Sequence, residues 1–560
     1  MNIFLAQQNY HIGNFELNTD KIIEAIEEAK KQSADLVVFS ELAVCGYPPR
    51  DFLEFNDFVE QSLTCIDRIK EHTESIGVLV GAPSRNLDPR GKNLFNSAYL
   101  LYEKEIKGIV HKTLLPNYDI FDEYRYFEPA YNWEVLQFKG RRLAVTICED
   151  IWNIGDDPLY RICPMDMLMQ QHPDLMINLS ASPFDYVHTA GRKETILKNV
   201  TKYQLPMIYC NTVGSQTEIV FDGGSLVAGA NGQIIAELPY FIEATYTVKL
   251  KDNTDFDEDL VEHRNDISIN LQTSPIFDEH IGIELIHSAL LLGIKDYFRK
   301  MGFAKAIVAS SGGIDSAVVL ALACQALGPE SVTALLMPSQ FSTDHSLIDA
   351  KQLSKNLGNH YEVIDIRHIF ENYLHALYPI FKELPFNVAE ENLQSRIRGT
   401  LVMALSNKFG SILLNTSNKS ELATGYGTLY GDMAGGLGVI GDLYKMQVYA
   451  LARYINKDKE IIPLNIIKKE PSAELRPEQK DIDSLPAYTD LDPILFQYIE
   501  HRLGPKEIIA LGYKSELVIR ILKMVNVNEY KRNQFCPIIR VSPKAFGIGR
   551  RVPIVGKYLS

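Results

Sequence analysis

Seven consecutive residues in the second half of the chain, Ser310-Ser311-Gly312-Gly313-Ile314-Asp315-Ser316, have the composition of an anion-binding loop. Glycines let the backbone turn its N–H groups toward a phosphate, and the start of a helix adds partial positive charge. Asp315 fits such a loop if it holds Mg²⁺, which prefers oxygen ligands and accompanies phosphates. No Gly-Lys-Ser/Thr follows, so the loop is not of the Walker A type. The alternative is a Gly-Gly turn that merely packs a helix on a strand.

Three further residues have side chains that could take part in catalysis, and each stands where an apolar run ends in the first half of the chain: Glu41, Lys112 and Cys148. A cysteine in such a place is most often a small buried hydrophobe, and a lone Lys or Glu is most often solvated. Here the chain turns polar directly after the sulfur, at Glu149 and Asp150. Because α/β proteins place chemistry at the carboxyl ends of strands, each of the three is a candidate site residue.

The elements that must position these residues indicate two α/β domains. The chain has 560 residues, which exceeds one ordinary core. Short apolar strands, helices and turns alternate over residues 1–250. From 283 to 560 strands and helices alternate in the βαβ pattern of a doubly wound parallel sheet. Between them, 251–282 is rich in Asp and Glu and is expected to be a linker.

Composition narrows the functional classes. A formal net charge of −15 argues against nucleic-acid binding as the main task. No apolar run reaches transmembrane length, and we expect no membrane association. The 7 cysteines include no C-x-x-C pair, so disulfide frameworks are not expected and a reducing cytoplasm fits best.

The blocks Ser40-Glu41-Leu42, Lys112 to Phe127 and Cys148-Glu149-Asp150 resemble the nitrilase superfamily. The resemblance implies an α-β-β-α sandwich in which Cys148 is the nucleophile, Glu41 the base, and Lys112 the group that stabilises thiolate and oxyanion, with Glu123 supporting Lys112. In its amidotransferase members the substrate is L-glutamine. By that resemblance Tyr118, Ser182 and Arg192 hold the polar ends of glutamine, with Lys193 as the alternative carboxylate clamp.

The Ser310–Ser316 loop resembles that of the N-type ATP pyrophosphatases. Together with Asn392, the block from Thr416 to Gly436 and Lys531, it is similar to the NAD⁺ synthetases. The resemblance implies that the loop and Thr416 bind ATP, and that Lys445 lies by its phosphates. It further implies that Asn392, Glu421 and Lys531 bind deamido-NAD⁺, and that Asp315 and Glu421 lie at Mg²⁺.

Both resemblances imply a cytoplasmic, glutamine-hydrolysing ligase that amidates deamido-NAD⁺ to NAD⁺ and releases AMP, pyrophosphate and glutamate. We also expect a homo-oligomer. Two alternatives stay open: a related ligase acting on a different carboxylate or base, and a nitrilase-type hydrolase whose second half only binds nucleotide.

Overall fold

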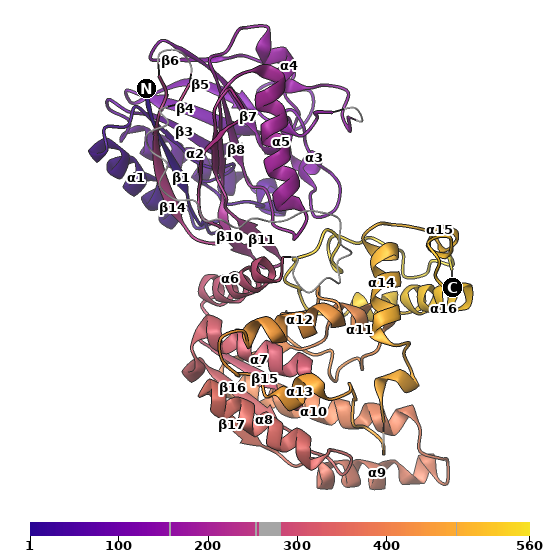
Figure 1. Ribbon diagram of the computed structural model, residues 1–560. Coiled ribbons are helices and arrows are strands. Elements are labelled where there is room, and N and C mark those ends of the chain that lie inside the picture. Colours follow the sequence, from indigo (N-terminus) through magenta and orange to yellow (C-terminus); the bar gives the residue numbers. More distant parts are fainter. Residues whose placement is uncertain (156–157, 252–254, 257–281, 478, 560) are drawn as a thin grey trace. The chain divides into compact units, whose positions relative to one another are not determined.

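The computed structural model describes residues 1–155, 158–251, 255–256, 282–477 and 479–559 (Figure 1). It divides into two compact units, Met1–Ile269 and Asn270–Ser560, each with its own core. The acidic linker predicted over 251–282 lies almost entirely outside the described residues. Among the residues described, no helix combines the length and the apolar character needed to cross a membrane.

Unit 1 is built on two six-stranded sheets that pack face to face. In the first, the order is β14 (Ala244–Lys249), β1 (Asn2–Gln7), β2 (Leu36–Val38), β3 (Gly77–Arg85), β4 (Leu94–Tyr102) and β5 (Glu105–His111). In the second, it is β13 (Ile234–Glu237), β12 (Leu226–Ala228), β9 (Met207–Asn211), β8 (Leu175–Ser180), β7 (Arg141–Ile147) and β6 (Leu136–Phe138). A separate ribbon pairs β10 (Val213–Gln216) with β11 (Ile219–Asp222).

Helices complete the sandwich of unit 1. The first sheet carries α1 (Phe15–Lys31) and α2 (Asn56–Lys70), and the second carries α4 (Pro164–Met169) and α5 (His188–Tyr203). In α1 the residues Ile22, Ile26 and Ala29 are buried, because their spacing places them on one face of the helix. The core between the sheets takes Val38 from one sheet and Val145 from the other. The predicted α-β-β-α architecture is thus confirmed.

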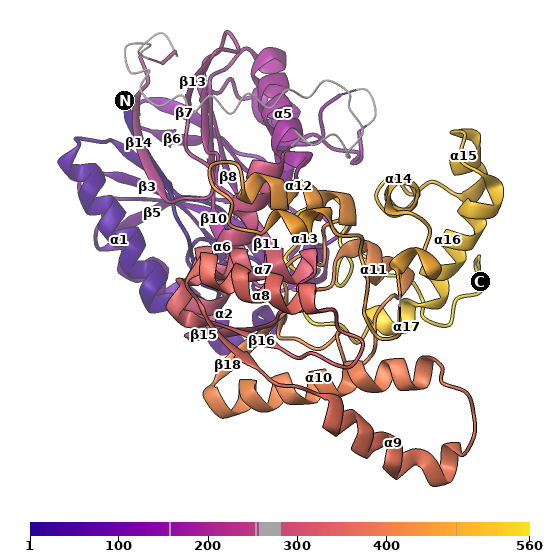
Figure 2. The ribbon, with the colours of Figure 1, turned by 60° about the horizontal axis from the view of Figure 1, so that its bottom comes forward.

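Unit 2 contains a five-stranded sheet in which every pair of neighbours is parallel. Its order is β17 (His360–Val363), β16 (Val332–Leu336), β15 (Lys305–Ala309), β18 (Ser411–Asn415) and β19 (Leu437–Gly438). Figure 2 shows α6 (Ile283–Met301), α7 (Ile314–Leu327) and α8 (Asp344–Leu357) on one side of the sheet, with α9 (Arg367–Phe381) and α10 (Val388–Phe409) on the other. The sheet is therefore doubly wound, as predicted. Its order reverses between β15 and β18, where such folds bind ligands.

The remaining helices of unit 2 follow the sheet in sequence. They are α11 (Lys419–Thr424), α12 (Lys445–Ile455), α13 (Leu464–Lys468), α14 (Tyr488–Ile499), α15 (Pro505–Ala510), α16 (Ser515–Val527) and α17 (Glu529–Arg532). Residues of α11, α14 and α16 share an apolar core with Ile538 and Phe546 of the C-terminal segment. That core anchors α11 and α12, which carry functional residues described below.

Candidate active sites

In unit 1 the structure brings Glu41 and Lys112 together at strand ends, next to Cys148. The Lys112 ammonium lies 2.7 Å from Glu41 Oε1 and 2.8 Å from Oε1 of Glu123, the first residue of the short helix α3 (Glu123–Tyr126). All four side chains are buried, and the charges of both Glu41 and Lys112 act on the Cys148 thiol. Two carboxylates on one ammonium fix that ammonium in place and keep it charged.

Further hydrogen bonds hold the carboxylate of Glu41. Its Oε1 accepts from Asn96 Nδ2 at 2.7 Å, and its Oε2 accepts from the backbone N–H of Ala181 at 3.0 Å. Tyr47 donates its hydroxyl to Glu123 Oε1 at 2.7 Å. Sequence reasoning did not find these three partners, because no sequence motif marks Asn96, Tyr47 or Ala181.

The electrostatics of this site favour a neutral thiol at rest. Burial and the negative charge of Glu41 raise the pKa of Cys148 well above its usual range, although Lys112 acts in the opposite direction. Burial disfavours the charge on Lys112, but Glu123 and Glu41 outweigh it and hold the pKa of the ammonium well above its usual value. Burial also raises the pKa of Glu123 to about 7. The thiol therefore needs a neighbouring base before it can attack.

The backbone at Cys148 has an unusual conformation. Its φ is +43°, in the left-handed region, and it opens a 3₁₀ turn over Cys148–Ile151 directly after β7. A non-glycine residue held there indicates local strain that the surrounding structure maintains.

Two clusters of polar side chains stand out in the same unit. In the first, which includes the neighbour of Cys148, Glu149 Oε1 accepts hydroxyls from Tyr118 at 2.9 Å and from Tyr160 at 3.1 Å. In the second, Ser182 Oγ lies 3.1 Å from His188 Nε2, and the His188 ring stacks on Trp152 with centroids 4.6 Å apart. Tyr118 and Ser182 were predicted, whereas Glu149 and His188 were not assigned a role from the sequence.

The geometry gives no support to either predicted carboxylate clamp. The buried guanidinium of Arg192 makes a two-pronged pair with Asp222 of β11, at 2.8 and 2.7 Å. Lys193 pairs with Glu237 at 2.7 Å. Arg192 therefore has a charge partner inside the fold, and its sequence position alone did not reveal that.

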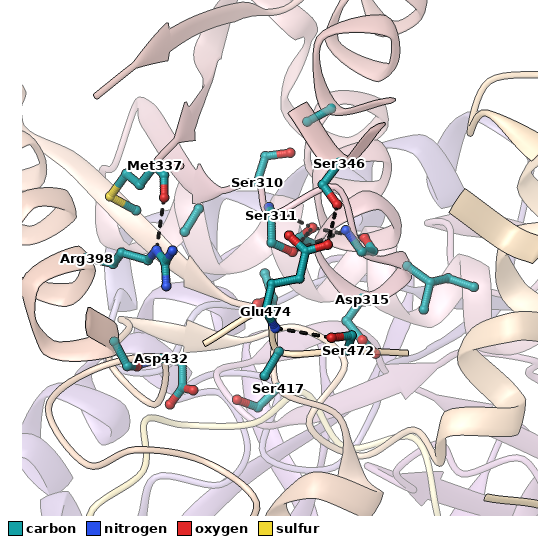
Figure 3. Close-up of a pocket in the computed structure, with 18 of the residues that line it drawn as sticks. Ser310, Ser311, Asp315, Met337, Ser346, Arg398, Ser417, Asp432, Ser472 and Glu474 are labelled. Carbon is teal, nitrogen blue, oxygen red and sulfur yellow. Dashed lines mark hydrogen bonds between the residues drawn. The ribbon is translucent and has the colours of Figure 1, made fainter. Parts of the chain in front are cut away.

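In unit 2 the predicted nucleotide residues line one pocket between the ends of β15 and β18 (Figure 3). The lining includes Ser310, Ser311, Gly313, Ile314, Asp315, Ser316, Thr416, Glu421 and Lys445. Gly312 has φ +81°, and a Cβ there would lie 2.3 Å from the carbonyl oxygen of Ser346. Only glycine fits at that position, because both the conformation and the space exclude a side chain.

Asp315 and Glu421 converge on a single cation. Lys445 Nζ lies 2.6 Å from Asp315 Oδ2 and 3.4 Å from Glu421 Oε1. Asp315 Oδ1 also accepts from Asn418 at 2.9 Å. Burial and the charge of Asp315 raise the pKa of Glu421 to about 8, which shows how strongly these carboxylates need a positive partner. Two carboxylates beside a phosphate loop fit the oxygen ligands that Mg²⁺ takes.

A second polar cluster lines the same pocket (Figure 3). Glu474 Oε1 accepts from Ser346 Oγ at 2.7 Å and from Lys469 Nζ at 2.6 Å, and this ion pair lowers the pKa of Glu474 despite its partial burial. Arg398 donates from Nε to the carbonyl oxygen of Met337, just after β16, at 3.0 Å. Sequence reasoning assigned no role to Ser346, Lys469 or Glu474.

Asn392 and Lys531 lie against the Gly-rich loop, residues 425–436, and outside the set of residues that line this pocket. Asn392 Oδ1 accepts the hydroxyl of Thr428 at 2.7 Å. Lys531 donates to the carbonyl oxygens of Gly425 and Gly427 at 2.7 and 2.9 Å, and partial burial lowers its pKa. Within one chain, both residues therefore support the loop.

A buried ion cluster lies next to Glu421 of α11 and close in sequence to Lys445 of α12. Lys419 Nζ lies 2.9 Å from Asp442 Oδ1 and 2.8 Å from Glu500 Oε1. Asp442 Oδ2 accepts the backbone N–H groups of Val541 and Ser542 at 2.8 and 2.7 Å. The C-terminal segment is thereby tied to the base of the nucleotide site.

Comparison with known proteins agrees with this division. The carbon-nitrogen hydrolase family matches residues 3–255, and the NAD synthase family matches residues 286–535. The chain is 44% identical to the glutamine-dependent NAD(+) synthetase of Synechocystis sp., with 99% of this chain and 98% of the relative covered. It is 40% identical to that of Thermotoga maritima, covering 100% and 99%. The glutamine-dependent NAD+ synthetase of Acinetobacter baumannii, solved in complex with ADP, is 37% identical with a TM-score of 0.76, covering 99% of this chain and 98% of that one.

A nitrilase-type unit with a buried Glu-Lys-Cys set and a doubly wound unit with a phosphate loop define a ligase fused to a carbon-nitrogen hydrolase. The chain belongs to the glutamine-dependent NAD(+) synthetase family.

Proposed function

We propose that this chain amidates deamido-NAD⁺ to NAD⁺, using ATP and ammonia from L-glutamine, and releases AMP, pyrophosphate and glutamate. The observation that carries this proposal is the presence of two chemically distinct sites on one chain: a buried cysteine beside Glu41 and Lys112, and a phosphate-loop pocket with paired carboxylates. Each site has a role in the overall reaction that the other lacks.

In the first reaction Glu41 takes the proton of Cys148 Sγ, and the thiolate attacks the carbonyl carbon of the glutamine side-chain amide. The Lys112 ammonium stabilises the developing oxyanion. The C–N bond then breaks, Glu41 returns the proton to the leaving nitrogen, and ammonia departs. Water hydrolyses the thioester to glutamate and restores the thiol.

The two polar clusters described above suit the two ends of glutamine. Glu149, held by Tyr118 and Tyr160, has the charge to accept the α-ammonium. Ser182 and His188 offer donors to the α-carboxylate, the role that Arg192 was expected to fill.

In the second reaction the loop Ser310–Ser316 and Thr416 bind ATP, and Lys445 neutralises phosphate charge. A nicotinate carboxylate oxygen attacks the α-phosphorus, pyrophosphate leaves, and ammonia displaces AMP from the mixed anhydride. Asp315 and Glu421 would hold Mg²⁺, which supplies charge neutralisation for the leaving pyrophosphate. Asn392, Glu421 and Lys531 are the proposed contacts of deamido-NAD⁺, the first and last through the Gly-rich loop that they support.

We also propose that the chain works as a homo-oligomer in the cytoplasm. From the end of α9 to the start of α10, Tyr378, Ile380, Leu384 and Val388 are 61%, 74%, 70% and 62% exposed, which is unusual for apolar side chains so close in the chain. A second copy covering them would bury that surface. All 7 cysteines are free thiols, as a reducing compartment maintains them. Size-exclusion chromatography with light scattering tests the oligomer.

Replacing the nucleophile tests the proposed division of labour. Cys148→Ala should abolish NAD⁺ formation from glutamine and keep NAD⁺ and AMP formation from ammonium, because Cys148 serves only to make ammonia. The measurement follows NAD⁺, AMP and glutamate with ATP, deamido-NAD⁺ and either nitrogen source. A folded variant that also loses the ammonium reaction would contradict two separate sites.

A further inference from the structure

Asp150 stands two residues after the nucleophile and contacts the backbone on both sides of the hydrolase site. Its Oδ1 accepts the N–H of Thr113 at 3.0 Å and the N–H of Leu114 at 2.8 Å. Its Oδ2 accepts the N–H of Ile147 at 3.0 Å. Thr113 directly follows Lys112, and Ile147 directly precedes Cys148.

The rest of the backbone around Lys112 has fixed partners as well. The Lys112 N–H donates to the carbonyl oxygen of Asn96 at 2.8 Å, and its own carbonyl accepts from Ala130 at 3.0 Å. Lys112 comes just after the end of β5, so hydrogen bonds of the sheet do not set the direction of the peptides of Thr113 and Leu114. Asp150 sets that direction, because one carboxylate oxygen receives both N–H groups.

The Asp150 carboxylate is suited to fixing the backbone and is not available to react with substrate. Asp150 is 2% exposed, and both of its oxygens are occupied by backbone donors. Burial raises its pKa to about 7, although the three N–H groups oppose the increase. Burying a carboxylate costs free energy of desolvation, and here its hydrogen bonds to three backbone N–H groups offset part of that cost and fix the position of the backbone.

We infer that Asp150 is a positioning residue that sets the placement of Lys112 relative to Cys148. It links the strand that ends at the nucleophile, in the second sheet, to the strand that ends at the ammonium, in the first. The inference rests on the proposed glutaminase reaction, since it concerns the same trio.

The test uses the full-length chain with Asp150→Asn, which keeps the shape but places an amide N–H₂ opposite a backbone N–H. A shift of about 1 Å between reacting groups can cost about 100-fold in rate. We expect the glutaminase kcat to fall by about 10- to 100-fold while the KM for glutamine stays within about twofold. Alkylation of Cys148 by iodoacetamide at fixed pH should slow in parallel, because Lys112 would no longer favour the thiolate. The ammonium-dependent synthesis in unit 2 should be unchanged.

A matched control separates positioning from general weakening of unit 1. Asp174 also accepts a backbone N–H of β7, that of Arg142 at 2.8 Å, at the start of the strand and away from the trio. Asp174→Asn should leave the glutaminase kcat and the alkylation rate unchanged. Equal losses in the two variants, or a wild-type kcat in Asp150→Asn, would overturn the inference.

Two further measurements complete the test. If Asp150→Asn is not recovered as a folded protein, Asp150→Glu keeps both acceptors but displaces them, and the same selective fall in kcat is expected. Glutaminase activity of the wild-type chain, lost in Cys148→Ala, is the separate criterion for the proposed function. An inactive wild type would refute that function, whereas an active wild type with an unaffected Asp150→Asn would refute only the positioning.

Discussion

The paired burial of Arg192 and Asp222 leads to a prediction about both stability and substrate binding. Arg192→Met leaves the Asp222 carboxylate, which is 0% exposed, without its cation. Breaking a buried pair from one side costs about 3–5 kcal/mol. In a unit of this size that corresponds to a fall of about 6–20 °C in the unfolding temperature. The double variant Arg192→Met/Asp222→Leu removes both charges and should recover most of the loss.

Calorimetry on the full chain can measure this effect, because two compact units need not unfold in one transition and the scan resolves them. Glutamine KM is measured in parallel at a temperature where Arg192→Met is folded. If Asp222 is the true partner of Arg192, KM stays within about twofold. Loss of a charged hydrogen bond to the substrate would instead raise KM by about 10- to 150-fold. That increase, with an unchanged unfolding temperature, would refute the structural role and restore the predicted clamp.

Two further changes test unit 2. Asp315→Asn removes a partner of Lys445 and a proposed Mg²⁺ ligand. Both the glutamine- and the ammonium-driven syntheses of NAD⁺ should therefore fall at least tenfold and respond less to Mg²⁺, while glutamine hydrolysis survives. Normal ammonium-driven turnover would contradict this role. Burial raises the pKa of Asp492 to about 7 from 3.8, so the folded chain keeps a proton that the unfolded chain has lost, and this carboxyl's contribution to stability falls as pH rises from about 4 to about 7. Asp492→Asn should flatten that part of the pH dependence of denaturant unfolding, and an unchanged slope would assign it to other groups.

Much of the architecture followed from local pattern. Apolar runs identified the strands, and their ends marked Glu41, Lys112 and Cys148 as candidates. Only the resemblance to the nitrilase superfamily grouped the three as one set. A capping box formed by Asn387 and Glu390 marks the start of α10 at Val388, and this signal can be read from the sequence.

Other features had no local signal. Glu474 meets Ser346 across 128 residues, and Arg192 meets Asp222 across 30. Neither pairing follows from helix or strand periodicity, because periodicity states which face a residue occupies and not which distant residue faces it. Lys531 was assigned to the dinucleotide by resemblance alone, and no local pattern indicated that within the chain it donates to the carbonyls of Gly425 and Gly427.

The bond of Asp442 to Val541 and Ser542 has a consequence for the order in which the sites form on the ribosome. The first sheet of unit 1 is complete once β14 pairs with β1, at Lys249. Unit 2 is tied together by Val541 and Ser542, which are synthesised much later. Because domains fold as units during synthesis, unit 1 can be assembled while unit 2 is still unfinished. A nascent chain therefore passes through an interval in which the unit that would release ammonia precedes the unit that would use it.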